Sequence, residues 1–207
     1  MIERRRWVSV ASAAAAAALW ASGPALAAPS YGGVPSHSSV TFVGSQQGEK
    51  FTGSIKSYDA RIRFAADDLA GSSLDVTLQL KSIDTNSPDR DQAIATADWF
   101  NVAEYPTATF RTVAIRSTPA GPVGEADLVI KGHTKRIPFP FTWKSGSAGA
   151  TLDGRVTLDR LDFGLGTGDW ADDSVVGRKV EVVVHLTLAP AATAPAAKPG
   201  PNAAKRP

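Results

Sequence analysis

The chain has 207 residues, contains no cysteine and carries a formal net charge of +2 at pH 7. The absence of cysteine excludes disulfide bonds, thiolate metal sites and a cysteine nucleophile. Residues 1–27 contribute +2 and residues 190–207 contribute +3, which leaves −3 for the residues between them. The excess of basic residues therefore belongs to the two ends, and the central part of the chain has no electrostatic feature of a nucleic-acid-binding protein.

The first residues have the pattern of a secretory signal peptide. Residues 4–6 are arginines, residues 8–21 form an apolar, alanine-rich run, and residues 25–27 (Ala-Leu-Ala) form a small-residue cleavage site. The apolar run is too short to be a convincing membrane span. We therefore predict a signal peptide over residues 1–27 and export of the mature protein to the periplasm.

The last residues have a composition that does not favour a folded structure. Residues 190–207 are mostly alanine, proline and lysine, and no apolar side chain among them is larger than alanine or proline. Such a segment cannot bury enough apolar surface to offset the entropy of ordering. We predict a disordered tail here, and one folded domain over residues 28–189.

Within this domain, apolar and polar residues alternate with the period of two that is typical of β-strands. The clearest run is residues 74–81, where leucine and valine alternate with polar side chains. Because the runs follow one another at hairpin spacing, the predicted fold is all-β and antiparallel. We prefer a lipocalin-like barrel of eight strands or slightly more to a sandwich, since eight strands enclose an interior that fits side chains or one slim ligand.

One stretch in the middle of these strands indicates a helix. Ser87 suits the N-cap position, and Pro88 suits the first helical position. The stretch then ends in two large aromatic residues, Trp99 and Phe100. We predict one short inserted helix over residues 87–100 that acts as a gate or a floor for the barrel.

Several short motifs occur in a characteristic order between residues 38 and 188. They are Ser82-Ile83-Asp84-Thr85, Asp98-Trp99-Phe100, Tyr105-Pro106-x-Ala108-x-Phe110, Lys131-Gly132-x-Thr134 and Arg160-x-Asp162-Phe163-Gly164. In this order they resemble the motifs of the YceI-like family. The resemblance implies a periplasmic, lipocalin-like barrel that binds or transports a polyisoprenoid such as a quinone or a polyprenyl chain. It also implies, for some members, an association with a membrane b-type cytochrome.

The candidate lipid-binding residues are apolar side chains of the inward strand phase, the phenylalanine of the last motif and three aromatic residues near the predicted mouth. They are Phe42, Phe64, Leu78, Phe110, Leu128, Phe141 and Val182, then Phe163, then Trp99, Phe100 and Trp170. For any one inward residue, an ordinary packed core is the alternative interpretation. A ring at the mouth could seal the barrel instead of holding a ligand.

Two arginines are candidates for the polar head of such a ligand. Arg90 and Arg160 could each donate hydrogen bonds to a phosphate or a quinone oxygen. The alternative is an ion pair with a neighbouring acid, such as Asp91 or Asp162.

Catalytic and metal-binding patterns are weak. The three histidines, His37, His133 and His185, are far apart, and neither G-x-S-x-G nor H-E-x-x-H occurs. We expect no catalytic residue, no metal and no cofactor other than a bound lipid, and the outward polar phase predicts no stable membrane insertion. The alternative function is an enzyme that isomerises or dehydrates an apolar substrate in the barrel, which would need titratable groups with displaced pKa values inside it.

Overall fold

The computed structural model describes residues 28–33 and 37–191, so the predicted signal peptide and nearly all of the predicted tail lie outside the described residues. The described residues form one antiparallel sheet of eleven strands. The strands are β1 (Ser30–Gly33), β2 (Ser39–Gln46), β3 (Glu49–Ile55), β4 (Tyr58–Arg63), β5 (Ser73–Gln79), β6 (Ile83–Asp84), β7 (Thr107–Thr118), β8 (Gly121–Ile130), β9 (His133–Gly146), β10 (Gly149–Asp159) and β11 (Lys179–Pro190).

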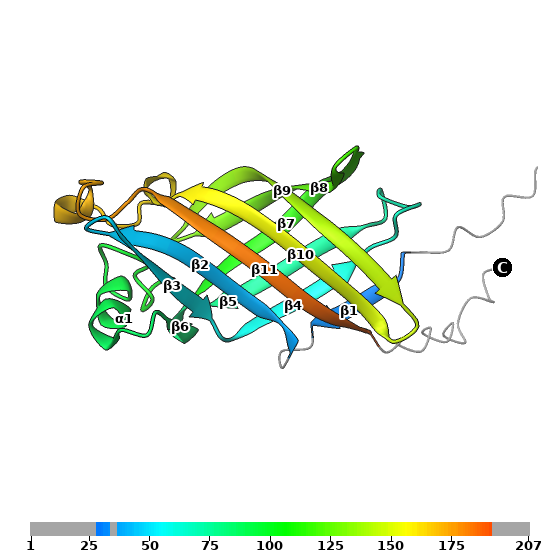
Figure 1. Ribbon diagram of the computed structural model, residues 1–207, viewed down its shortest axis with the longest axis horizontal. Coiled ribbons are helices and arrows are strands. Elements are labelled where there is room, and N and C mark those ends of the chain that lie inside the picture. Colours follow the sequence, from blue (N-terminus) through cyan, green and yellow to red (C-terminus); the bar gives the residue numbers. More distant parts are fainter. Residues whose placement is uncertain (1–27, 34–36, 192–207) are drawn as a thin grey trace, which may run out of the picture.

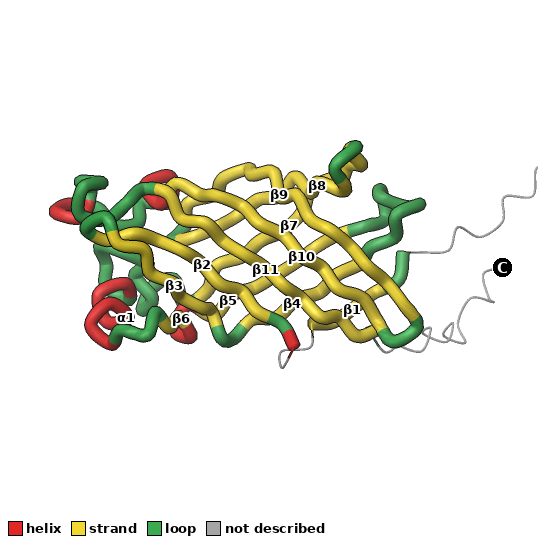
Figure 2. Tube along the Cα trace, in the orientation of Figure 1, coloured by secondary structure: helices red, strands yellow, loops and turns green. Residues whose placement is uncertain are grey.

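The sheet closes into a barrel (Figures 1 and 2). Strand β11 pairs with both β1 and β2, with Tyr31 opposite Pro190 and Phe42 opposite Val182. On their other side, β1 pairs with β4 and β2 pairs with β3. Strands β1 and β2 therefore share one of the eight positions around the barrel, because both pair with β11. In the same way β3 and β4 share a second position and β5 and β6 a third, and β7 to β11 occupy the other five. The predicted eight-stranded, lipocalin-like barrel is confirmed, and β11 extends one residue past the predicted domain end at residue 189.

Two tight turns fix the register of hairpins at one end of the barrel. Gln47 and Gly48 join β2 to β3 with φ angles of 51° and 85°, and Lys131 and Gly132 join β8 to β9 with φ angles of 48° and 75°. Two successive residues with positive φ form the turn whose twist matches that of the flanking strands. The glycine at the second position adopts this conformation without steric cost.

The other end of the barrel is filled by packed side chains. Phe64 lies against Phe141 and Trp143, with ring centroids 5.4 and 4.8 Å apart. Buried aliphatic residues of β4, β5, β10 and β11 complete this cluster. Burial of each large apolar side chain contributes about 1.5–3 kcal/mol, so this cluster stabilises the domain and forms the floor of the barrel.

The helical insert is shorter than predicted. Helix α1 spans Pro88–Ile94, and Ser87 is its N-cap, with Oγ accepting a hydrogen bond from Arg90 N at 3.4 Å. Helix α1 ends at Ile94, where the N and Oγ1 of Thr96 both donate to the Ala93 carbonyl, at 3.1 and 2.7 Å; these local bonds replace the helical ladder. The predicted helix over residues 87–100 is therefore correct at its start and wrong in its second half, which consists of turns. The described residues also include the short 3₁₀ helices η2 (Leu80–Ser82), η3 (Arg160–Phe163) and η4 (Gly168–Trp170).

Strands β9 and β10 pair over only part of their lengths. Residues 141–146 of β9 pair with β10, whereas residues 133–140 pair with β8 alone. Pro138 and Pro140 fall in this second part, where only one neighbouring strand requires backbone donors. Helix η3 contacts both strands beside this gap, and its Phe163 is 2% exposed. Of the helices in the described ranges, none is long and apolar enough to cross a membrane.

Candidate functional site

A cavity of about 440 Å³ occupies the barrel interior between the α1 end and the packed floor. This volume lies within the range of about 300–1,000 Å³ that small-molecule sites occupy. Its wall is almost entirely apolar, with contributions from the strands, α1, η3 and η4. The polar side chains that line it are Thr41, Ser45, Gln46, Ser87, Asp89, Arg90 and Arg160.

Nine of the eleven apolar residues selected from the sequence line this cavity. They are Phe42, Leu78, Trp99, Phe100, Phe110, Leu128, Phe163, Trp170 and Val182. The other two, Phe64 and Phe141, are 3% and 4% exposed and belong to the packed floor. They point inward as predicted, but below the cavity, because the alternation of a strand gives the face of a residue and not its depth in the barrel.

Glycines in the wall make room for the inward phenylalanine rings near the α1 end. Phe42 is opposite Gly53 and Phe51 is opposite Gly44 in the β2–β3 ladder. A Cβ atom on Gly44 would lie 2.8 Å from the Phe51 ring, and one on Gly53 would overlap the Phe42 ring. Each ring therefore lies across the opposite glycine and against the wall. This arrangement keeps the middle of the barrel open.

Trp99 and Trp170 lie together at the α1 end of the cavity, with ring centroids 6.0 Å apart. Their segments are joined through the backbone, since the carbonyl of Asp98 accepts hydrogen bonds from Gly166 N at 2.8 Å and from Thr167 N at 3.3 Å. The segment after α1 and the segment between β10 and β11 thus form a single cover. Figure 1 shows both at the same end of the barrel.

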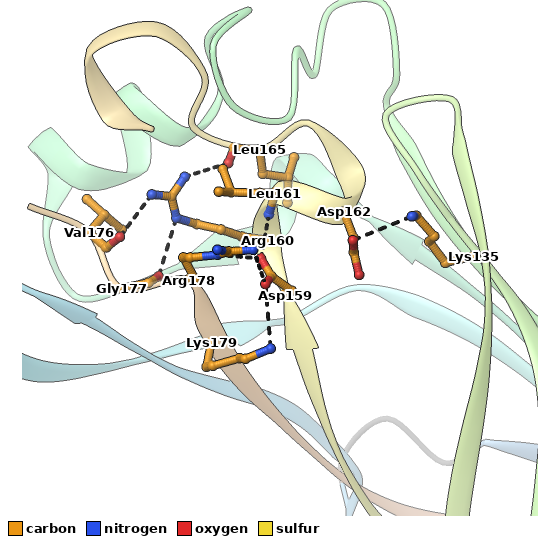
Figure 3. Close-up of polar contacts among 10 residues, drawn as sticks. All are labelled: Lys135, Asp159, Arg160, Leu161, Asp162, Leu165, Val176, Gly177, Arg178 and Lys179. Atoms are coloured by element: carbon orange, nitrogen blue, oxygen red, sulfur yellow. Dashed lines mark hydrogen bonds and ion pairs between the residues drawn. The ribbon is translucent and has the colours of Figure 1, made fainter. Parts of the chain in front are cut away.

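Arg160 organises the segment between β10 and β11 (Figure 3). Its side chain is buried, and the residue is 2% exposed. A guanidinium carries five N–H donors, and here five hydrogen bonds run to backbone oxygens. The acceptors are Leu165, Gly166, Trp170, Val176 and Gly177, at 2.8, 2.7, 2.5, 2.9 and 3.3 Å.

These bonds determine what Arg160 can do in the site. Burial lowers the pKa of its guanidinium from the ordinary value, and the ring of Trp99 lies 5.4 Å from Cζ, within the range of a cation–π contact. Asp162 pairs with Lys135 at 3.4 Å, so the alternative Arg160–Asp162 ion pair is wrong. While its five bonds hold, Arg160 has no donor left for a ligand head group.

Gly166 leaves room for the Arg160 side chain, and Asp159 caps η3, the 3₁₀ helix that contains Arg160. Gly166 has a φ of 69°, and a Cβ atom there would overlap the guanidinium and lie 2.8 Å from the Trp99 ring. Asp159 Oδ1 accepts from Leu161 N at 3.1 Å, and its Oδ2 accepts from Arg178 at 2.8 Å. Partial burial raises the pKa of the Asp159 carboxyl, but the hydrogen bonds from Arg178 and Leu161, together with the charges of Arg178 and Lys179, lower this pKa overall.

Arg90 of α1 has a different environment. Its Nε and Nη2 donate to Gln46 Oε1 at 3.4 and 3.3 Å, and its Nη1 donates to the Thr85 carbonyl at 3.4 Å. Its Cζ lies 4.1 Å from the centroid of the Phe51 ring. The alternative Arg90–Asp91 pair is wrong, because Asp91 Oδ1 accepts from Thr85 Oγ1 and Thr85 N at 2.6 and 2.9 Å.

The remaining titratable side chains form no recognisable catalytic or metal site among residues 28–33 and 37–191. His185 Nδ1 lies 2.5 Å from Asp153 Oδ1 on the outer face, and no group of three or more His, Asp or Glu side chains is arranged to hold a metal ion. Of the described residues that line the cavity, only Asp89, Arg90 and Arg160 are titratable. No two of these three side chains form an interacting acid–base pair.

A family model described as the YceI-like domain matches residues 31–188. The chain belongs to the YceI-like family. Among its relatives, a UPF0312 protein from Ectopseudomonas mendocina is 32% identical over 137 residues, which cover 62% of this chain and 72% of that protein. Protein YceI from Escherichia coli O157:H7 is 27% identical over 142 residues, which cover 65% and 71%.

Two solved structures share the YceI-like barrel. BcnA from Burkholderia cenocepacia is 30% identical, with a TM-score of 0.71, and the match covers 75% of this chain and 98% of BcnA. A polyisoprenoid binding domain from Saccharophagus degradans is 15% identical, with a TM-score of 0.64, and the match covers 79% and 99%. At this identity, the second likeness shows the fold alone.

The sequence did not reveal every part of the site of this YceI-like protein. Gln46, which lines the cavity and accepts hydrogen bonds from Arg90, gave no signal because it ends a strand beside a polar turn. Leu165 and Val176 line the cavity from a segment rich in glycine and aspartate that has no periodicity. Their places follow from the hydrogen bonds of Arg160, and a local sequence pattern does not encode these.

Proposed function

We propose that this protein binds a long apolar lipid of the polyisoprenoid class inside its barrel and carries it across the periplasm. The cavity carries the proposal: it is apolar, runs along the barrel and is closed at one end by the packed floor. Each methylene that leaves water contributes about 0.8 kcal/mol before the entropic costs of binding. The description of the Saccharophagus degradans neighbour as a polyisoprenoid binding domain supports this ligand class.

The composition of the cavity wall supports binding in preference to catalysis. General acid–base chemistry requires groups whose pKa values suit proton transfer. Of the titratable side chains described in the lining, Arg160 has a pKa lowered by burial and uses its donors on backbone oxygens. The enzyme interpretation would need a proton acceptor in this wall, and the exposed Asp89 at its edge is a poor candidate.

The periplasmic location is supported by the signal-peptide pattern of residues 1–27, which lie outside the described residues. A carrier that shields an apolar chain from water suits an aqueous compartment between two membranes. A role beside a membrane b-type cytochrome, in which the carrier delivers a quinone, stays a prediction that the binding proposal does not require.

Titration with a soluble isoprenoid tests the proposal, with tryptophan fluorescence as the readout. Trp99 and Trp170 line the cavity, so we expect a saturable change in fluorescence with one ligand per protein.

Trp99→Ala should weaken binding by about tenfold, because an aromatic contact contributes about 1 kcal/mol or more. His133→Ala, outside the lining, should have no effect. An unchanged spectrum at saturating isoprenoid, together with no retained ligand after gel filtration, would exclude the proposed ligand class.

A further inference from the structure

Arg90 and Gln46 connect two elements that border the cavity at its α1 end. Arg90 belongs to α1, and Gln46 is the last residue of β2. Both line the cavity, and their hydrogen bonds at 3.3 and 3.4 Å join the helix to the β2–β3 hairpin. The guanidinium also lies over the Phe51 ring, 4.1 Å from its centroid. This is a polar group placed at the end of an apolar cavity.

The hydrogen bonds of Arg90 leave part of its capacity unused. Its three bonds are long and run to two neutral oxygens, those of Gln46 and Thr85, whereas a guanidinium has five donors. No carboxylate within residues 28–33 and 37–191 lies within ion-pair distance of it. Asp91 is occupied by Thr85, and Asp89, which also borders the cavity, is exposed to solvent.

Arg160 is the second cation among the described residues of the cavity wall, and its environment differs from that of Arg90. It donates five hydrogen bonds at 2.5–3.3 Å and is 2% exposed. Arg90 is half-buried, weakly bonded and accessible from the cavity. Of the two arginines, Arg90 therefore has the donors that a ligand could use.

We infer that Arg90 and Gln46 form a head-group site for an anionic oxygen group, a carboxylate or a phosphate, on an amphiphile whose chain fills the cavity. The inference rests on the proposed function. A guanidinium binds such groups through two parallel, charge-assisted hydrogen bonds, and the side-chain amide of Gln46 can turn to donate a third. A neutral hydroxyl would only replace the neutral oxygens already present. The site thus selects by charge, in addition to the selection for an apolar chain.

Three ligands with one chain and different head groups test this inference: farnesol, farnesoic acid and farnesyl phosphate. They are titrated by calorimetry into the full mature chain at low salt. We expect the wild-type protein to bind the two anions at least about tenfold more tightly than the alcohol. A larger preference for one anion would identify the head group as a carboxylate or as a phosphate.

Three variants show whether Arg90 is the cause. In Arg90→Gln, the preference for anions should disappear, while the affinity for farnesol stays within about twofold. Gln46→Glu keeps Arg90 but supplies a carboxylate partner, so it should also reduce the preference. Lys50→Gln is the matched control: it removes the same charge from an exposed residue on β3, next to Phe51, and should leave the preference unchanged.

The outcomes separate this inference from the proposed function. Equal affinities of the wild-type protein for the three ligands would overturn the head-group site alone. So would a preference that survives in a folded Arg90→Gln or Gln46→Glu protein. Failure of all three ligands to bind would overturn the proposed function, and the head-group site with it.

Discussion

Replacement of Arg160 by alanine is expected to lower the free energy of unfolding by at least about 3 kcal/mol. The substitution removes five hydrogen bonds and leaves several buried carbonyl oxygens without a donor. Each such oxygen costs about 1–3 kcal/mol. For a domain of this size, the melting temperature should fall by roughly 6–12 °C, which differential scanning calorimetry measures directly.

Two further variants give the Arg160 prediction its controls. Arg160→Lys keeps the charge but has three donors, so its melting temperature should lie between those of the wild-type protein and Arg160→Ala. Arg61→Ala removes an arginine whose side chain is 83% exposed in its ion pair with Asp59, and this should cost no more than about 1 kcal/mol. If Arg160→Ala melted as high as Arg61→Ala, Arg160 would not organise the cover of the barrel.

A tryptophan at position 182 is expected to weaken lipid binding roughly 100-fold while the barrel remains folded. Val182 lines the cavity, and its partners across the ladders are Phe42 and Val156. In Val182→Trp the indole would take up space that the ligand chain needs. Displacement of about four methylene groups costs about 3 kcal/mol, or roughly 100-fold in affinity. Calorimetric titration with a farnesyl ligand gives the affinity.

The neighbouring residue supplies the control for this substitution. Val183 lies on the opposite face of β11, next to the inward-facing Val182. Val183→Trp should bind the ligand as the wild-type protein does. Equal affinities of Val182→Trp and the wild-type protein would show that the ligand does not occupy this cavity, provided that circular dichroism shows both variants to be folded.

The strand pattern predicts the faces of the barrel well. Alternation places Phe42, Leu128 and Val182 inward, and all three line the cavity. It does not distinguish the cavity from its floor, because depth depends on the register between neighbouring strands. For this reason Phe64 and Phe141, which have the same inward phase, are part of the packed end.

The cover of the barrel could be predicted only in part. The N-cap Ser87 is a local signal and is confirmed, whereas the end of α1 depends on a set of turn hydrogen bonds among residues 93–102. The partners of the two arginines are not local either. Arg160 bonds to residues up to 17 positions away, and Arg90 bonds to Gln46, 44 positions away. The acid beside each arginine in the chain, Asp91 or Asp162, was the alternative partner, and the fold brings other oxygens closer.

Solvent extraction and mass spectrometry of the protein, purified from the periplasm without detergent, test the central proposal most directly. We expect close to one equivalent of a polyisoprenoid-type lipid per protein, with an anionic head group. The Val182→Trp protein, purified in the same way, should carry far less. A wild-type protein that contains no lipid, and that fails to take up an added isoprenoid, would contradict the account.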